Sequence, residues 1–267
     1  ACAMALVGNI GRLVVFVLVC IAAVRVRLHA VITYGRIIHE FDPWFHFRAT
    51  QYLVDNGWTK FITWFDEESW WPIGRPVGTT IYPGMQATAA AFYHVLTYLG
   101  TGISLNDICV FIPCVFAVIT CIFTFGLAYE VGGATVGVCA AAIMSVLPAH
   151  LMRSVAGGYD NESIAVAAMC GVFYFWVRSL RPGSWPLGVV AALAYFYMAA
   201  AWGGYTFVIN MVGMHAGALI LVGKFTPNLH HSYSLFYIVG TYLAMTVPII
   251  GWAPLESMEQ MGPLGVF

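Results

Sequence analysis

Two short acidic motifs in this chain have a spacing that suits metal binding. Glu40-Phe41-Asp42 and Asp160-Asn161-Glu162 each place two carboxylates one residue apart. In an extended or turning backbone such carboxylates can converge on one hard divalent cation, and Mg²⁺ and Mn²⁺ prefer oxygen ligands. Acidic residues are also common as solvated loop charges. From the spacing alone, a shared cation site and ordinary loop charges are both open interpretations.

Arg153 lies seven residues before Asp160 and has two possible roles. It could anchor the chain at the membrane surface, or it could hold a carboxylate or phosphate through bidentate hydrogen bonds. Gly157 and Gly158 would permit the tight turn that brings the second motif to that surface. Asn161-Glu162-Ser163 also forms a glycosylation sequon, but it lies too close to a predicted span to be modified readily.

Four histidines lie near the first motif or form a pair elsewhere in the chain. His39 and His46 flank the first acidic motif. We expect them to be hydrogen-bonded loop residues and not metal ligands, because Mg²⁺ and Mn²⁺ favour oxygen. His230 and His231 are expected in a loop on the other side of the membrane, so they cannot join the same site.

The composition shows which kind of protein must position these residues. Of the 267 residues, 61% are hydrophobic and only 9% are charged, whereas soluble domains are roughly a quarter charged. Eleven basic and twelve acidic residues give a net charge of −1, which argues against a nucleic-acid surface. The seven cysteines have no CxxC spacing, and we expect them to pack as small apolar residues. The chain is therefore predicted to be an integral membrane protein.

Apolar runs predict an all-α polytopic fold with about seven transmembrane helices. A span needs about 20 mainly apolar residues, and the run 187–222 is long enough for two, divided at Trp202-Gly203-Gly204. Arg25 and Arg27 must snorkel or face other protein at the end of the first run. The apolar runs are 13–24, 108–129, 134–152, 163–177, 187–222 and 235–254.

Loop charges predict the orientation of these spans. Short connections on one side carry Arg12, Arg178, Arg181 and Lys224, and the positive-inside rule makes that side cytoplasmic. All acidic residues except Glu130 then fall on the opposite, lumenal face. The long first lumenal loop, 35–107, is rich in aromatic residues, and we expect short interfacial helices at 42–55 and 83–99 within it.

The chain resembles the catalytic subunit of oligosaccharyltransferase. Residues 38–48 (IHEFDPWFHFR) are similar to the first lumenal motif of that family, and residues 153–162 (RSVAGGYDNE) to its second. The intervening segments 64–66 (WFD), 70–75 (WWPIGR) and 80–84 (TIYPG) are also similar. His46 and Gly158 stand where the family is expected to have Asn and Ser. Neither departure removes a carboxylate.

This resemblance implies a C-type glycosyltransferase of the endoplasmic reticulum membrane. Such an enzyme moves an oligosaccharide from dolichyl pyrophosphate to the Asn amide of an Asn-x-Ser/Thr acceptor. The resemblance assigns Asp42, Asp160 and Glu162 as ligands of Mn²⁺ or Mg²⁺. It assigns Asp42 and Arg153 as catalytic, acceptor-binding residues, with Glu40 as part of the first motif. The implied partners are the lipid-linked donor, the acceptor polypeptide and other oligosaccharyltransferase subunits, and no nucleic acid.

The resemblance also bears on domain organisation. Residues 1–267 correspond to the N-terminal part of the membrane domain, with lumenal loops 35–107 and 153–162. The family's WWD-containing lumenal domain and its lipid-pyrophosphate arginine have no counterpart in this sequence. We therefore expect this polypeptide to be inactive in isolation, although it carries the implied metal ligands.

Two other functions are compatible with these features. A different polyprenyl-phosphate-sugar glycosyltransferase could share the fold and use another acceptor. A cation-coupled transporter could also use the acidic residues, but transporters place such groups near the bilayer midplane within broken helices. Here Asp42, Asp160 and Glu162 are predicted at the ends of spans.

Overall fold

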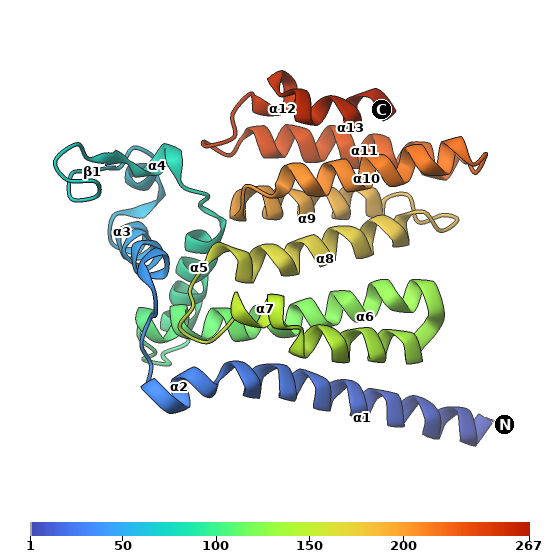
Figure 1. The fold of residues 1–267 in the computed structure, drawn as a ribbon, viewed down its shortest axis with the longest axis horizontal. Coiled ribbons are helices and arrows are strands. Elements are labelled where there is room, and N and C mark those ends of the chain that lie inside the picture. The colour runs from blue at the N-terminus through green and yellow to red at the C-terminus, as the bar shows by residue number, and fades with distance from the viewer. Residues whose placement is uncertain (1) are drawn as a thin grey trace.

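The computed structural model describes the backbone of residues 2–267 and the side chains of residues 8–267. The long helices lie roughly side by side, and the segment 28–104 gathers at one end of them (Figure 1). The break within the helical stretch 105–146 and the connections 180–186 and 222–226 lie at the opposite end. The long helices are α1 (Cys2–Arg27), α6 (Leu105–Val146), α8 (Asn161–Ser179), α9 (Leu187–Ala201), α10 (Tyr205–Leu221) and α11 (Pro227–Met245).

Helix α6 contains two of the predicted spans. Its 42 residues are interrupted at Gly133, whose φ of 80° lies in the left-handed region that glycine adopts easily. The two arms fold back on one another (Figure 1). The second arm ends at Val146, because Pro148 lacks an N–H and instead begins the short helix α7 (Pro148–Met152). The prediction that this span continues to residue 152 was therefore wrong.

The later helices agree with the predicted breaks but not with every boundary. Trp202, Gly203 and Gly204 separate α9 from α10, as predicted. Helix α11 begins earlier than expected, because the Thr226 hydroxyl accepts the N–H of Leu229 at 3.1 Å and caps the helix. The observed helix is therefore displaced toward the N-terminus relative to the predicted run 235–254. His230 and His231 lie in this helix and not in the predicted loop.

The long first loop is more structured than an all-α description allows. The predicted interfacial helices correspond to α3 (Phe41–Ile62), which is interrupted at Gly57, and α5 (Gly84–Tyr98). Between them, β1 (Phe65–Asp66) pairs antiparallel with β2 (Arg75–Pro76). The all-α prediction thus missed this small sheet. The remaining short elements are α2 (His29–Tyr34), α4 (Val77–Thr80), α12 (Ala253–Glu256), the 3₁₀ helix η1 (Met258–Gln260) and α13 (Met261–Val266).

The membrane character of the fold is clearest in its longest helices. Within the described residues, Gly8–Tyr34 and Leu105–Val146 are the two helical stretches long and apolar enough to cross a membrane. Helices α9 and α10 are apolar but shorter. On α1, Leu13, Leu18 and Ile21 are more than half exposed, which is the pattern expected of a helix that faces lipid.

Arg27 faces protein, which is one of the two expectations for it. Its side chain is fully buried at the end of α1. Its Nε donates to Ser154 Oγ at 2.9 Å, and Nη1 donates to the carbonyls of Ala23 at 2.9 Å and Ser145 at 2.8 Å. Nη2 lies 3.0 Å from Nδ1 of His150. This guanidinium therefore joins α1 to α6, to α7 and to the loop that follows α7.

The cysteine prediction is confirmed in part. The six cysteines with described side chains form no disulfide. Cys109, Cys114 and Cys121 are buried, whereas Cys139 is exposed on α6. The side chain of Cys2 lies outside the described residues.

Candidate active site

The two acidic motifs meet at one cavity although they are more than a hundred residues apart in sequence. The cavity has a volume of about 370 Å³ and is called the acidic cleft below. It contains four of the five predicted site residues. Glu40 precedes α3, is exposed, and is not among the residues that line the cleft. The lining residues are Asp42, Phe45, His46, Arg75, Thr80, Ile81, Tyr82, Arg153, Asp160, Asn161, Glu162 and Trp202.

Helix α3 presents the first motif to the cleft. Asp42 lies in the first turn of α3, and His46 follows one helical turn later. Residues four apart share a helix face, which explains why both side chains line the same cavity. Thr50, one turn further, contacts the hydroxyl of Tyr159 at 2.9 Å and joins α3 to the second motif.

The second motif begins helix α8. Asp160 is the cap residue before α8, and its carboxylate accepts the N–H of Asn161 at 2.7 Å. Glu162 lies in the first turn. The positive end of the helix dipole stabilises negative charge at both positions.

Backbone hydrogen bonds fasten the loop 153–160, called the second acidic loop below, to three other segments. The N–H of Gly157 donates to Val110 O in α6 at 3.0 Å, and Gly157 O accepts the N–H of His39 at 2.9 Å. The N–H of Ala156 donates to Arg27 O at 3.1 Å. The loop is therefore held directly against the segment that leads into the first motif.

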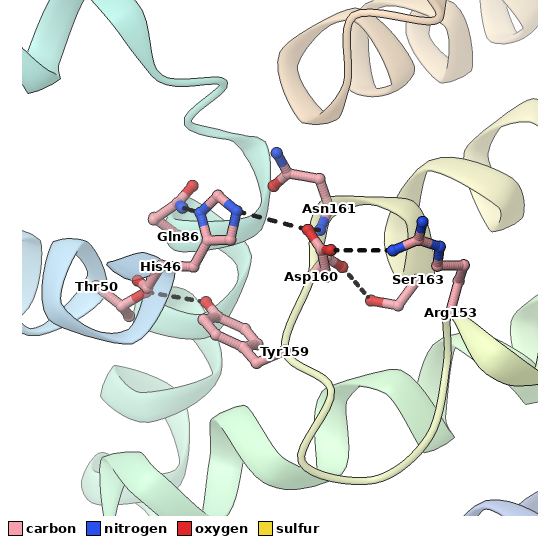
Figure 2. Close-up of polar contacts among 8 residues, drawn as sticks. All are labelled: His46, Thr50, Gln86, Arg153, Tyr159, Asp160, Asn161 and Ser163. Atoms are coloured by element: carbon pink, nitrogen blue, oxygen red, sulfur yellow. Dashed lines mark hydrogen bonds and ion pairs between the residues drawn. The ribbon is translucent and has the colours of Figure 1, made fainter. Parts of the chain in front are cut away.

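Asp160 is the electrostatic centre of the cleft. Figure 2 shows His46 and Arg153 approaching its carboxylate from opposite sides. The Nε2 of His46 lies 3.5 Å from Oδ1, and Nη1 of Arg153 lies 4.0 Å from Oδ2. Burial disfavours the charged form, but His46 and the Asn161 N–H outweigh it and hold the pKa of Asp160 below its usual value.

The pKa of Glu162 is shifted in the opposite direction to that of Asp160. Burial is the larger cause, and the neighbouring negative charge of Asp160 adds to it, so the pKa of Glu162 is raised. Two carboxylates with opposite shifts indicate a site where negative charge is crowded. A nearby cation would relieve that crowding.

The donor set of the acidic cleft suits a divalent cation. Three carboxylates and one imidazole line the same cavity, and these groups are common ligands of Mg²⁺, Mn²⁺ and Zn²⁺. Among the described side chains, no three His, Cys, Asp or Glu groups are already grouped closely enough to hold an ion.

Arg75 is a cleft residue that the sequence did not single out. Its guanidinium lies 4.8 Å from the ring centroid of Phe45 and 5.0 Å from that of Trp70. It also donates to Thr80 Oγ1 at 3.0 Å and to Thr80 O at 3.1 Å. Burial lowers the pKa of Arg75, and the charge of Asp42 partly offsets this. Its position at the end of the WWPIGR segment, which resembles the family, was the signal that could have identified it from the sequence.

Two buried polar residues that contact α3 were also missed. Tyr159 is fully buried, and its hydroxyl contacts Thr50 and donates to Met85 O at 3.3 Å. Gln86 on α5 is fully buried, and its side-chain amide contacts Nδ1 of His46 at 2.9 Å. Nothing in the local sequence distinguishes a buried Gln from an exposed one, so Gln86 carried no signal.

Gly157→Ala is expected to disturb the cleft, whereas Gly158→Ala should not. Gly157 has a φ of +88°, and an added Cβ would clash with Ile37 O and lie 2.7 Å from Cδ2 of His39. The backbone strain alone should cost about 1–3 kcal/mol. At Gly158 an added Cβ meets only Val155 O at 3.2 Å. Thermal unfolding of the two variants in detergent, compared with wild type, measures the difference, and equal midpoints would contradict this account of the loop.

The fold and the acidic cleft define a helical membrane protein with a carboxylate site at the ends of its helices. A family model described as "Oligosaccharyl transferase STT3, N-terminal" matches residues 12–267. The chain therefore belongs to the STT3 family of oligosaccharyl transferases, which confirms the resemblance inferred from the motifs.

Curated relatives agree with this assignment. The chain is 41% identical over 268 residues to the dolichyl-diphosphooligosaccharide–protein glycosyltransferase subunit STT3 of Saccharomyces cerevisiae, covering 100% of this chain and 37% of that protein. It is 44% identical over 255 residues to the corresponding subunit of Schizosaccharomyces pombe, covering 95% of this chain and 34% of that protein. The chain thus spans about a third of the length of the curated relatives it matches.

Solved structures share the fold. The apo oligosaccharyltransferase of Archaeoglobus fulgidus superposes with a TM-score of 0.73 at 19% identity, covering 96% of this chain and 32% of that one. A structure of the archaeal enzyme AglB with an inhibitory peptide and a dolichol-phosphate gives 0.70 at 18% identity, covering 97% and 36%. A complex with Zn and sulfate gives 0.64 at 18% identity, covering 94% and 34%.

Proposed function

We propose that this protein catalyses the transfer of an oligosaccharide from dolichyl pyrophosphate to the Asn of Asn-x-Ser/Thr acceptors. Family membership supports the reaction class. The observation that carries the proposal is that Asp42, Arg153, Asp160 and Glu162, from two distant motifs, line one cleft. The match covers about a third of the relatives, so we assign residues 1–267 to the N-terminal part of the membrane domain, with the family's lumenal domain outside it.

The chemistry of the cleft suits an amide acceptor. An amide nitrogen is a poor nucleophile because its lone pair is delocalised into the carbonyl group. In this proposal Asp42 accepts hydrogen bonds from the acceptor N–H groups and weakens that delocalisation. Arg153, 57% exposed and 4.0 Å from Asp160, contacts the acceptor from the other side of the cleft.

We assign Asp42, Asp160 and Glu162 as the residues that would hold Mn²⁺ or Mg²⁺. Their oxygen donors suit either ion. The bound cation would stabilise negative charge on the departing pyrophosphate. The raised pKa of Glu162 and the burial of Asp160 are consistent with a site that is completed by positive charge.

We further propose an orientation and partners for the whole protein. The α1–α11 helices would make seven crossings of the endoplasmic reticulum membrane, with α6 contributing two. The end that carries Arg178 and Arg181 would be cytoplasmic, and both arginines pair there with Glu130. The cleft would then open to the lumen, where donor and acceptor meet. Other oligosaccharyltransferase subunits would be partners of the assembled enzyme.

A transfer assay tests this function. The full-length protein is expressed in cells depleted of their own STT3-family subunit, and membranes receive dolichyl pyrophosphate-linked oligosaccharide and a fluorescent peptide containing Asn-Ala-Thr. We expect a glycopeptide whose mass equals peptide plus oligosaccharide, no product with Gln-Ala-Thr, and loss of product with EDTA. Transfer to a lipid or sugar acceptor but not to the peptide would instead identify a different polyprenyl-phosphate-sugar transferase.

The geometry disfavours the transporter alternative. Asp42 lies in the first turn of α3, and Asp160 precedes α8. Both carboxylates are thus at helix ends, whereas coupling residues of transporters lie near the middle of spans. Cation-dependent solute uptake without peptide modification would reverse this conclusion.

A further inference from the structure

His46 lines the cleft and lies between the two acidic motifs. It follows Asp42 by one turn of α3, and both side chains line the cavity. Figure 2 shows its ring directed at the carboxylate of Asp160. The two side chains are only 10% and 18% exposed. His46 is therefore an unusually well buried nitrogen donor among the carboxylates assigned to the cation.

The distance between His46 and Asp160 fits two ligands of one ion. Their Nε2 and Oδ1 atoms are 3.5 Å apart, which is longer than the roughly 2.7–3.2 Å of an ordinary hydrogen bond. Two ligands at about 2.0–2.2 Å from one metal are roughly 2.8–3.1 Å apart at octahedral angles and roughly 3.3–3.6 Å apart at tetrahedral angles, so 3.5 Å falls in the tetrahedral range. Arg153 approaches the other oxygen, Oδ2. Oδ1 accepts the Asn161 N–H at 2.7 Å, and its second lone pair remains to bind a cation together with Nε2.

Gln86 holds the imidazole in this position. Its side chain is fully buried on α5, and its amide contacts Nδ1 of His46 at 2.9 Å. Oε1 of Gln86 has no hydrogen-bond partner in the present amide orientation. Turned by 180°, the amide would place Oε1 on Nδ1–H, which leaves Nε2 unprotonated and available to a metal. A ligating His usually donates its other N–H to such an acceptor.

We propose that His46 is a ligand of the same cation as Asp42, Asp160 and Glu162. The inference rests on the proposed metal site. Imidazole nitrogen suits transition metals, whereas Mg²⁺ favours all-oxygen ligands. The sequence had favoured a hydrogen-bonded loop role for His46, but the residue lies in a helix and faces the carboxylates.

Electron spin-echo spectroscopy of Mn²⁺ bound to the purified full-length protein tests the proposal directly. A coordinated imidazole produces ¹⁴N modulation, which should be present in wild type and change to the ¹⁵N pattern when histidine is ¹⁵N-labelled. We expect the modulation to disappear in His46→Asn and to persist in His39→Asn, which alters the other histidine beside the first motif. The wild-type measurement needs no variant, so poor folding of His46→Asn leaves the test intact.

Metal competition supplies the second measurement. His46→Asn should reduce the preference for Mn²⁺ over Mg²⁺ by about tenfold, and Gln86→Leu should weaken Mn²⁺ binding by about tenfold while the nitrogen signal remains. Binding of Mn²⁺ that requires Asp160 but shows no nitrogen signal would overturn the role of His46 and leave the metal site intact. Absence of any Mn²⁺ binding that depends on Asp160 would overturn the metal site as well.

Discussion

Replacing Asp160 with Asn in the full-length protein is expected to reduce oligosaccharide transfer by on the order of 10²–10³-fold, the loss typical when a preorganised electrostatic group is removed. Asn preserves the volume of the side chain but removes its negative charge. That charge faces His46 and Arg153 and is assigned to the cation. Asp42→Asn and Glu162→Gln should have effects of similar size. The peptide transfer assay measures the rates across a range of Mn²⁺ concentrations.

The matched control is Asp55→Asn. Asp55 is an exposed carboxylate on the same helix as Asp42, but it does not line the cleft. Its substitution should leave transfer within a factor of about two, since surface changes away from a site have small effects. Normal transfer by Asp160→Asn would count decisively against the proposed site. A loss of equal size in Asp55→Asn would show that transfer responds to the loss of any negative charge and not to the carboxylates of the cleft.

Arg27→Met is expected to destabilise the protein by about 3 kcal/mol or more. Arg27 is fully buried and supplies hydrogen bonds to Ser154, Ser145 and Ala23, with His150 as a fourth contact. Each buried acceptor that is left without a donor costs about 1–3 kcal/mol. Tryptophan fluorescence during thermal unfolding in detergent measures the loss.

A second consequence of Arg27→Met should be localised. Ser154 follows Arg153 in the second acidic loop, so loss of its partner should raise amide hydrogen exchange over residues 153–160. Arg25→Met is the control, because Arg25 is two residues away but exposed, and its substitution should cost no more than about 0.5 kcal/mol. Equal unfolding midpoints for the two variants would show that the buried hydrogen bonds of Arg27 contribute little.

Much of the fold was predictable because its signals are local. Apolar runs identified the long helices, and the Trp202-Gly203-Gly204 interruption marked the break between α9 and α10. Boundaries set by single capping residues were less predictable. Thr226 begins α11 earlier than hydropathy indicated, and Pro148 ends a helical run that remained apolar. The β1–β2 pair was missed because two-residue strands carry no periodicity.

The site was predictable to a different extent. Asp42, Arg153, Asp160 and Glu162 were named from motifs and resemblance, and the structure places all four at one cleft, without Glu40. Arg75 was overlooked because its role depends on Phe45 and Trp70, which are brought beside it by the fold. His46 was considered but assigned to a loop, because its neighbour Asp160 is 114 positions away.

The sequence by itself determined the class of protein, the approximate helices and the identity of the acidic motifs, because hydropathy, glycine and proline effects and motif spacing act over a few residues. Only the tertiary structure decided that the two motifs share a cleft, that Arg27 is satisfied inside protein, and that His46, in contact with Gln86, faces Asp160. These contacts join residues 40 to 127 positions apart. They depend on the packing of α3, α5 and the second acidic loop together, and no local pattern encodes that packing.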